Sequence, residues 1–193
     1  SNMPEMPSIA LGTADATVFQ MVGAYGTFAN EGVYVKPVLV TRIEDKNGTV
    51  LFENTPETHD VVSAEVARAV VNLMEGVTRY GSGARLRTKG AETYNAIYKN
   101  VMTGYPYQFT NPIAGKTGTT QNNSDGWFIG MVPNLVTGVW VGGEDRAIRF
   151  RTTAYGQGAT MALPVFGYYM KKCYADKDLN ISKGAFPAPQ NKE

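Results

Sequence analysis

Three short runs rich in β-forming residues follow one another in the second half of the chain. They read NPIAGKTGTT (111–120), DGWFIGMVP (125–133) and LVTGVWVGG (135–143), and the segments between them are polar or contain Pro-Asn. Short turns of this kind join neighbouring antiparallel strands. We therefore predict an antiparallel meander over residues 113–142 as the centre of the fold.

The first helical pattern covers residues 13–30. Thr13 or Asp15 can cap its start, and Gly32 suits its stop. The apolar residues that recur at helical spacing are Val18, Met21, Val22, Tyr25 and Ala29. Two β-rich runs then flank Lys46-Asn47-Gly48, and Asn-Gly is the strongest short signal for a hairpin.

The second helical pattern opens at Ser63, and we expect Gly76 and the YGSG run at 80–83 to end it. Its predicted apolar face consists of Val66, Val70, Leu73 and Val77. Residues 84–109 have no clear period, so we predict a long loop with one helical turn there. Residues 158–173, GATMALPVFGYYMKKC, indicate a closing helix that packs on the sheet.

These elements predict an α+β fold in which an antiparallel sheet is flanked by helices. The chain has 193 residues, of which 43% are hydrophobic, enough for one sizeable core or two small ones. We expect 1–12 to be irregular, with the composition of a cloning scar at 1–2, 13–175 to be folded and 176–193 to be a flexible tail. No apolar run reaches the ~18 residues that a spanning helix needs.

The net charge, the single cysteine and the single histidine argue against several classes of function. Lys plus Arg is 18 and Asp plus Glu is 17, a balance that gives no reason to expect nucleic acid as a partner. Cys173 is the only cysteine and has no internal disulfide partner, so we interpret it as a small packed hydrophobe. His59 is the only histidine, and we expect no metal site and no cofactor.

The sequence Gly115-Lys116-Thr117 resembles the close of a phosphate-binding loop, G-x-x-x-x-G-K-[ST]. That pattern requires a glycine where this chain has Thr110, and Pro112 removes a backbone donor from the loop. The residues that follow, GTTQNNSDG, do not favour the helix whose N-terminus would face the phosphate. These departures argue against nucleotide binding.

Lys116-Thr117-Gly118-Thr119 is better explained as an extended strand that borders a cleft. Side chains alternate along a strand, so Lys116 and Gly118 point one way and the two threonines the other. Gly118 leaves the backbone uncovered, which allows another chain or a ligand to approach closely. Such a strand can pair with an extended peptide, or place a cation and an oxyanion-type donor beside a reacting carbonyl.

K-T-G is also part of the signature of penicillin-binding proteins and class A β-lactamases, together with S-x-x-K and S-D-N. Here AGKTGTT and the following DGWFIGMVPNLVTGVWVGGED closely resemble the end of the transpeptidase domain of class A penicillin-binding proteins. The segments MPSIALGTADATVFQMVGAYGTFANEGVYVKPVLVTRIEDKNGTVL and VVNLMEGVTRYGSGARL resemble the same domain in the same order. The resemblance spans roughly residues 7–172, apart from the stretch at 88–109, and identifies 13–175 as the C-terminal portion of that domain.

The resemblance implies a bacterial cell-wall enzyme. In this family a serine attacks the D-Ala-D-Ala end of a peptidoglycan stem peptide, and the acyl group then passes to an amine on a neighbouring stem. β-Lactams mimic the donor and trap the serine. By this resemblance Lys116 is a catalytic residue, Thr117, Gly118 and Thr119 bind substrate, and the Thr119 N–H helps to hold the oxyanion.

The nucleophile motif of the family is missing from this chain. None of its serines has a lysine three residues later, and none begins S-x-N. Tyr98-Lys99-Asn100 has a Y-x-N form, but it lies close before Lys116, and we interpret it as coincidence. We therefore expect the chain to be inactive alone, with the missing N-terminal part of the same protein as a partner that supplies the serine.

Other functional classes stay open. The chain can instead be a non-catalytic β-lactam-sensing or peptidoglycan-binding relative, or a structural or partner-binding domain that keeps the fold without the site. A class A β-lactamase is a weaker alternative, because 13–55 and 143–172 match penicillin-binding proteins better. The resemblance also implies a place on the extracytoplasmic face of the bacterial inner membrane, in the periplasm, with an anchor in an upstream segment.

Two further groups of residues have simpler interpretations. Arg85, Arg87 and Lys89 form a small basic group that we interpret as part of a solvated loop. The tyrosines at 94, 98, 105 and 107 are expected to fold back on the core, with a wall of the substrate cleft as the alternative.

Overall fold

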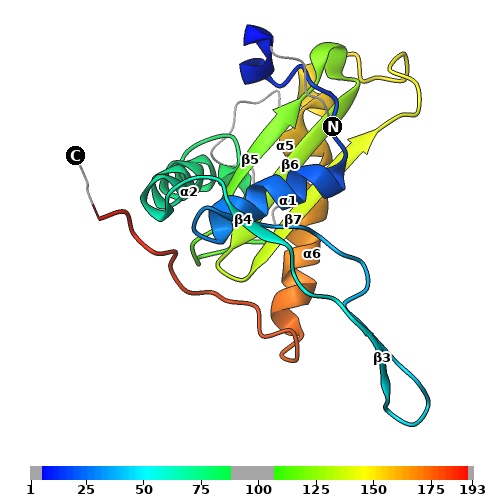
Figure 1. The fold of residues 1–193 in the computed structure, drawn as a ribbon. Coiled ribbons are helices and arrows are strands. Elements are labelled where there is room, and N and C mark those ends of the chain that lie inside the picture. Colours follow the sequence, from blue (N-terminus) through cyan, green and yellow to red (C-terminus); the bar gives the residue numbers. More distant parts are fainter. Residues whose placement is uncertain (1–5, 88–106, 191–193) are drawn as a thin grey trace.

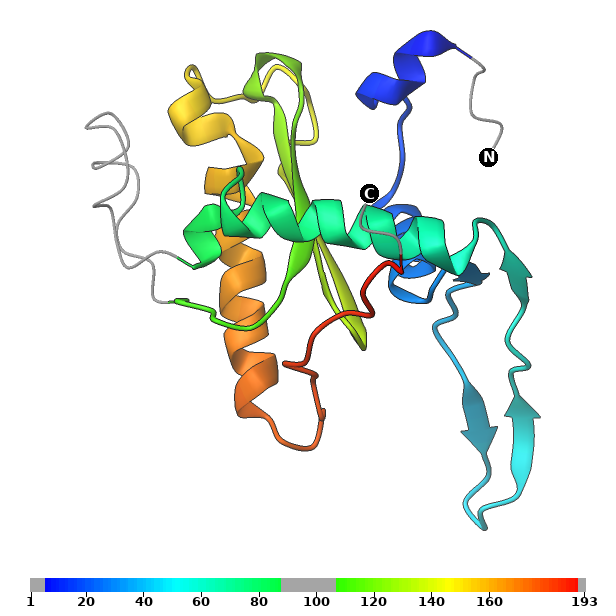
Figure 2. The same cartoon turned by 90° about the vertical axis from the view of Figure 1, so that its left-hand side faces the viewer.

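The computed structural model describes residues 6–87 and 107–190, and it confirms the predicted α+β architecture. A three-stranded sheet lies at the centre, and helices pack against both of its sides (Figures 1 and 2). The helices have the bounds α1 Val18–Ala29, α2 Ala64–Arg79, α4 Thr153–Gly156, α5 Gly158–Met161 and α6 Leu163–Ala175. Short 3-10 turns occur at η1 Pro7–Leu11, η2 Ala84–Leu86 and η4 Gln121–Asn123.

The predicted meander is confirmed as antiparallel strands in the order β5-β6-β7. Their bounds are β5 Ala114–Thr119, β6 Asp125–Val132 and β7 Leu135–Gly142. Gly130 in β6 faces α6, because a Cβ atom there would lie 2.5 Å from Cζ of Phe166. Gly138 in β7 faces α1, because a Cβ atom there would lie 2.6 Å from Cγ2 of Val22. The two glycines thus let a helix approach each face of the sheet closely.

The larger hydrophobic core lies between the sheet and α6. The rings of Phe128 and Phe166 are both fully buried, with centroids 4.9 Å apart. The other buried members of this core are Leu86, Tyr107, Phe109, Ile113, Val132, Ala162, Leu163 and Met170. The closing helix that was predicted over 158–173 is confirmed as helical, but it consists of two helices, α5 and α6, separated by Ala162. Pro164 lies in the first turn of α6, a position that a proline tolerates because its missing N–H has no helical partner.

Helix α1 starts later than the sequence pattern indicates. Its cap is Thr17, whose hydroxyl accepts a bond from the Gln20 N–H at 3.2 Å. The Gln20 side chain in turn accepts a bond from the Thr17 N–H at 2.9 Å. The prediction that Thr13 or Asp15 caps this helix was wrong, because the reciprocal bonds of this capping box satisfy two amide groups at Thr17 and Gln20.

Helix α2 starts where the sequence predicts. The hydroxyl of Ser63 accepts a bond from the Val66 N–H at 3.3 Å and caps the first turn. The helix continues through Gly76, so that part of the predicted stop was wrong, and it ends at Arg79, directly before the YGSG run at 80–83 that was also predicted to end it. A single glycine inside a helix costs only about 1 kcal/mol, so the packing of the flanking turns is sufficient to carry the helix past it.

The predicted apolar face of α2 was wrong. Leu73 is 75% exposed and Val66 is 49% exposed, although both belong to that face. The buried residues lie about 100° around the helix and include Ala67, Val71 and Thr78. Apolar residues occupy two stripes of α2, and helical spacing alone does not identify the stripe that contacts the sheet.

The predicted hairpin around Lys46-Asn47-Gly48 is confirmed, and it projects from the rest of the molecule (Figures 1 and 2). Its outer ladder pairs β2 Arg42–Glu44 with β3 Val50–Glu53, and its inner ladder pairs β1 Val33–Val35 with β4 Thr58–Asp60. Gly48 has φ +83°, a conformation that glycine adopts without strain. The carboxylate of Asp45 accepts bonds from the N–H groups of Asn47 at 2.8 Å and Thr49 at 2.9 Å.

The segment expected to be a flexible tail is described as far as residue 190. Asn134, in the β6–β7 turn, donates to the Asn180 carbonyl at 2.9 Å and accepts from the Ser182 N–H at 2.8 Å. The N–H of Gln190 donates to the Glu65 carboxylate at 2.8 Å. In the described part of the chain, no helix is both long and apolar enough to cross a bilayer.

Candidate functional site

Strand β5, which carries K-T-G, pairs with β6 along one edge, and no described strand lies along its other edge. Thr119 lies opposite Gly126, so Thr120 lies opposite Asp125, and the Thr120 N–H donates to the Asp125 carbonyl at 3.1 Å. Antiparallel pairs alternate between bonded and non-bonded, so Gly118 directs its backbone groups toward β6. The N–H and C=O groups of Thr117 and Thr119 therefore point away from β6. We call this the free edge of β5, residues 116–119.

The side chain of Lys116 lies on the face of the sheet that α1 covers. Lys116 is opposite Ile129, and Ile129 is opposite Gly138, which contacts α1. The exposed ammonium turns back across the free edge and donates to the Thr117 carbonyl at 2.6 Å. Among the described residues, no carboxylate lies within ion-pair distance of it. A cation thus stands at the free edge without a neutralising partner.

The two threonine side chains lie on the opposite face, as the alternation of a strand predicts. Thr117 is opposite Phe128, whose ring packs on α6. Oγ1 of Thr117 lies 2.7 Å from Oγ of Ser82, which is in the turn after α2. Thr119 Oγ1 accepts a bond from the Gly158 N–H at 3.0 Å, at the start of α5. Each hydroxyl therefore has a protein partner from a remote segment.

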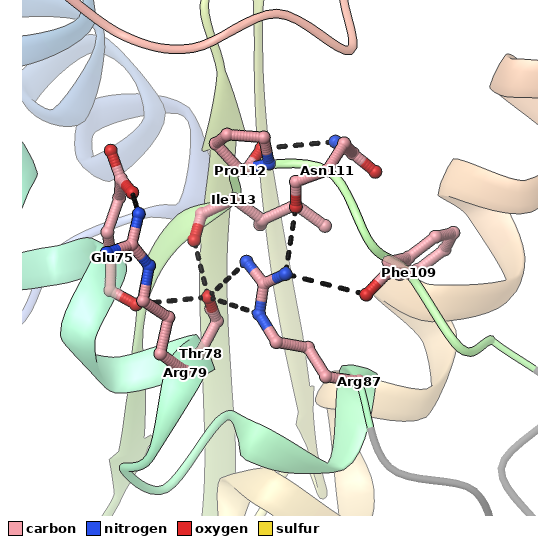
Figure 3. Close-up of polar contacts among 8 residues, drawn as sticks. All are labelled: Glu75, Thr78, Arg79, Arg87, Phe109, Asn111, Pro112 and Ile113. Carbon is pink, nitrogen blue, oxygen red and sulfur yellow. Dashed lines mark hydrogen bonds and ion pairs between the residues drawn. The ribbon is translucent and has the colours of Figure 1, made fainter.

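A polar network, buried at Thr78 and partly buried at Arg87, fixes the chain just before β5 (Figure 3). Thr78 Oγ1 donates to the Ile113 carbonyl at 2.5 Å and accepts from Arg87 Nη2 at 3.0 Å. Arg87 Nη1 donates to the carbonyl of Asn111 at 2.9 Å and to that of Phe109 at 3.5 Å. The C-terminal end of α2 and the turn that follows therefore hold the backbone from which β5 begins.

The prediction that Arg85 and Arg87 belong to a solvated loop was wrong. Arg85 is only 5% exposed, and its Nη1 donates to the Ala159 carbonyl at 3.1 Å and to Thr160 Oγ1 at 2.8 Å. Burial lowers the pKa of the Arg87 guanidinium, and the nearby charge of Arg79 lowers it further. Arg85 is buried and Arg87 is partly buried, because main-chain carbonyls and hydroxyls bind their planar donor groups.

Several predicted features lie outside the described residues, namely Lys89, Tyr98-Lys99-Asn100 and the tyrosines at 94, 98 and 105. Tyr107 is described, and it is buried against Gly167 of α6, where a Cβ atom would lie 2.6 Å from its ring. Within the described residues, no three His, Cys, Asp or Glu side chains come together as a metal-binding group. The groups that β5 presents to a ligand are the amide groups and hydroxyls of Thr117 and Thr119 and the ammonium of Lys116.

The sequence reasoning missed Ser82, Arg87 and Gly158 as parts of this site. Ser82 lies in the YGSG run, which was interpreted only as a helix stop, and no local pattern marks the other two. Taken together, the free edge can pair with an extended peptide, while the ammonium and the hydroxyls can bind an anionic end of that peptide.

Comparison with known proteins gives a consistent result. The family model described as "Penicillin binding protein transpeptidase domain" matches residues 5–158. Penicillin-binding protein 1A of Aquifex aeolicus is 34% identical over 183 residues, covering 93% of this chain and 22% of that protein. Penicillin-binding protein 1A of Clostridium novyi is 30% identical over 190 residues, covering 95% and 19%. The chain spans about a fifth of the length of the curated relatives it matches.

Solved structures show the same fold. Penicillin-binding protein 1A from Haemophilus influenzae superposes with a TM-score of 0.71 at 23% identity, covering 95% of this chain and 29% of that one. The penicillin-binding protein PonA1 from Mycobacterium tuberculosis superposes with a TM-score of 0.64 at 27% identity, covering 98% and 46%.

Proposed function

Because this chain belongs to the penicillin-binding protein transpeptidase domain family, we propose that it supplies the substrate-binding strand of a peptidoglycan D,D-transpeptidase. The observation that carries this proposal is the free edge of β5, where the outward backbone groups of Thr117 and Thr119 lie beside the unneutralised ammonium of Lys116. The ligand is a stem peptide that ends in D-Ala-D-Ala, or a β-lactam in its place.

The geometry supports a specific binding mode. An extended peptide that adds to the free edge can exchange main-chain bonds with Thr117 and Thr119. Its terminal carboxylate takes the ammonium of Lys116 away from the Thr117 carbonyl and accepts a bond from the Thr117 hydroxyl. The Thr119 N–H then lies where charge develops on the carbonyl oxygen during acyl transfer.

In the proposed reaction, a serine oxygen attacks the carbonyl carbon of the penultimate D-alanine. The C–N bond to the last D-alanine breaks, and that alanine leaves with the proton from the serine. An amine of a second stem peptide then attacks the same carbonyl carbon, the bond to the serine oxygen breaks, and the proton that the amine loses returns to the serine. Lys116 supports the proton transfer, and the serine is supplied by a part of the protein outside this chain, since no serine here begins S-x-x-K.

We place the whole enzyme on the extracytoplasmic face of the bacterial membrane, where its peptidoglycan substrate lies. We retain residues 13–175 as the C-terminal portion of its transpeptidase domain. The alternative is a non-catalytic relative that binds β-lactams or peptidoglycan through the same strand. The presence of S-x-x-K and S-x-N in the upstream sequence supports catalysis, and their absence supports this alternative.

The isolated chain should not be labelled by a fluorescent penicillin, because none of its serines has a lysine three residues later, the S-x-x-K pattern that activates the nucleophile in this family. The measurement is in-gel fluorescence after incubation and denaturation, with an intact penicillin-binding protein as the positive control. Label retained on any serine of this chain, located by peptide mass spectrometry, would refute this prediction.

The isolated chain should still recognise the peptide. Titration with diacetyl-L-Lys-D-Ala-D-Ala, followed by ¹⁵N NMR, should shift the amide signals of Thr117 and Thr119. Lys116→Ala should weaken this binding about tenfold or more, because the terminal carboxylate loses a charge-assisted bond. Lys46→Ala, which removes a lysine in the hairpin turn, is the matched control and should bind like the unmodified chain. Shifts confined to other regions, or equal binding by Lys116→Ala, would contradict the proposal.

A further inference from the structure

The exposed Ser82 side chain lies in contact with the site strand, although no part of the proposed function uses it. Its Oγ is 2.7 Å from Oγ1 of Thr117, and either oxygen can be the donor. We propose that Ser82 is a positioning residue that holds the Thr117 hydroxyl with its hydrogen directed at the carboxylate of the peptide. This inference rests on the proposed function and deepens it.

The turn that carries Ser82 is fixed on both sides. The Gly83 N–H donates to the Val77 carbonyl at 2.9 Å, so the turn closes on the end of α2. A Cβ atom at Gly81 would lie 2.9 Å from Cα of Val77, so only glycine fits this approach. After the turn, buried Arg85 is bonded to the start of α5. Ser82 is therefore presented to β5 from a rigid support.

The number of hydrogens supports the proposed direction of the bond. Two hydroxyls share one hydrogen bond, so one hydrogen remains for a third group. If Ser82 donates, Thr117 keeps its own hydrogen, and the bond from Ser82 polarises it toward an acceptor. A carboxylate beside Lys116 can only accept a hydrogen bond, so it favours the arrangement in which Ser82 donates to Thr117 over the one in which Thr117 donates to Ser82.

Thr119 shows the same arrangement with a different donor. Its Oγ1 accepts from the Gly158 N–H at 3.0 Å, so its hydrogen also remains available. A donor from outside the strand thus engages each threonine of β5. The donor at Thr119 belongs to the main chain, whereas the donor at Thr117 is a side chain and can be removed by substitution.

The first measurement uses the free chain and needs no ligand. Three-bond coupling constants should show one χ1 rotamer of Thr117 in the unmodified chain and in Ser82→Thr, and averaged rotamers in Ser82→Ala. Ser182→Ala is the matched control, because among the described residues the hydroxyl of that serine is bonded within its own segment, where it accepts from the Gly184 N–H at 3.1 Å. A single rotamer in Ser82→Ala overturns the positioning role.

The second measurement titrates diacetyl-L-Lys-D-Ala-D-Ala and its C-terminal amide. Ser82→Ala should bind the acid about fivefold more weakly, as expected for one hydrogen bond, and bind the amide unchanged. In a Thr117→Val background, Ser82→Ala should have no further effect on acid binding. Equal losses for acid and amide would indicate a structural role and overturn the inference. If the unmodified chain binds neither ligand at the free edge, the proposed function fails. The coupling constants of Thr117 then test on their own whether Ser82 holds its side chain.

Discussion

Phe166→Ala should lower the free energy of unfolding by about 3–5 kcal/mol. Phe166 is fully buried at the centre of the larger core, against the ring of Phe128, and its edge occupies the space that Gly130 leaves open. Alanine would leave a cavity there, because neither β6 nor α6 can close the gap without disturbing its other contacts. Urea denaturation followed by circular dichroism measures the loss.

Two further variants keep this expectation testable if Phe166→Ala does not fold. Phe166→Leu retains most of the volume and should cost less than about 1.5 kcal/mol. Val165→Ala changes an exposed neighbour on the same helix and should stay within about 0.5 kcal/mol. Similar losses for Val165→Ala and Phe166→Ala would show that the core does not lie where the structure places it.

Arg87→Ala should lower the free energy of unfolding by about 2–4 kcal/mol, because the carbonyl of Asn111 and the hydroxyl of Thr78 both lose a charged donor. Arg87→Lys should recover less than half of this loss. A lysine keeps the charge, but its single ammonium does not reproduce the planar group that reaches Thr78, Asn111 and Phe109 together. Urea denaturation again measures stability.

The matched control for this network is Arg146→Ala, which removes an exposed arginine that pairs with an exposed Asp15. An exposed pair is worth about 1 kcal/mol or less. Amide hydrogen exchange at Ala114 adds a local readout, since it should accelerate in Arg87→Ala and stay unchanged in Arg146→Ala. Equal stability of the two variants would mean that the network in Figure 3 does not support the start of β5.

The meander and the site strand were predictable because their signals are local. β-Forming runs separated by short polar turns allow few pairings, and Gly115-Lys116-Thr117 stands inside one such run. The face of α2 was not predictable from spacing. The stripe with Val66 and Leu73 is more apolar than the one with Ala67 and Thr78, yet the second packs on the sheet.

The supports of the site were not predictable for a related reason. Arginines are usually exposed, so Arg87 was assigned to solvent, and only tertiary contacts reveal the carbonyls that bind it. Ser82 and Gly158 meet β5 from segments 35 and 39 residues away from Thr117 and Thr119. No periodicity records a contact between such distant segments, so the threonines were predictable and their partners were not.

The projecting hairpin offers a place to attach a reporter group. Its turn is held by Asp45 and its own backbone, and its outer strands are exposed along their whole length. The only cysteine of the chain, Cys173, is buried. A cysteine introduced at Asn47 would therefore be the accessible thiol for a fluorophore or a surface tether. Such a label would leave the core and the free edge of β5 untouched, so ligand binding could be followed on an otherwise native surface.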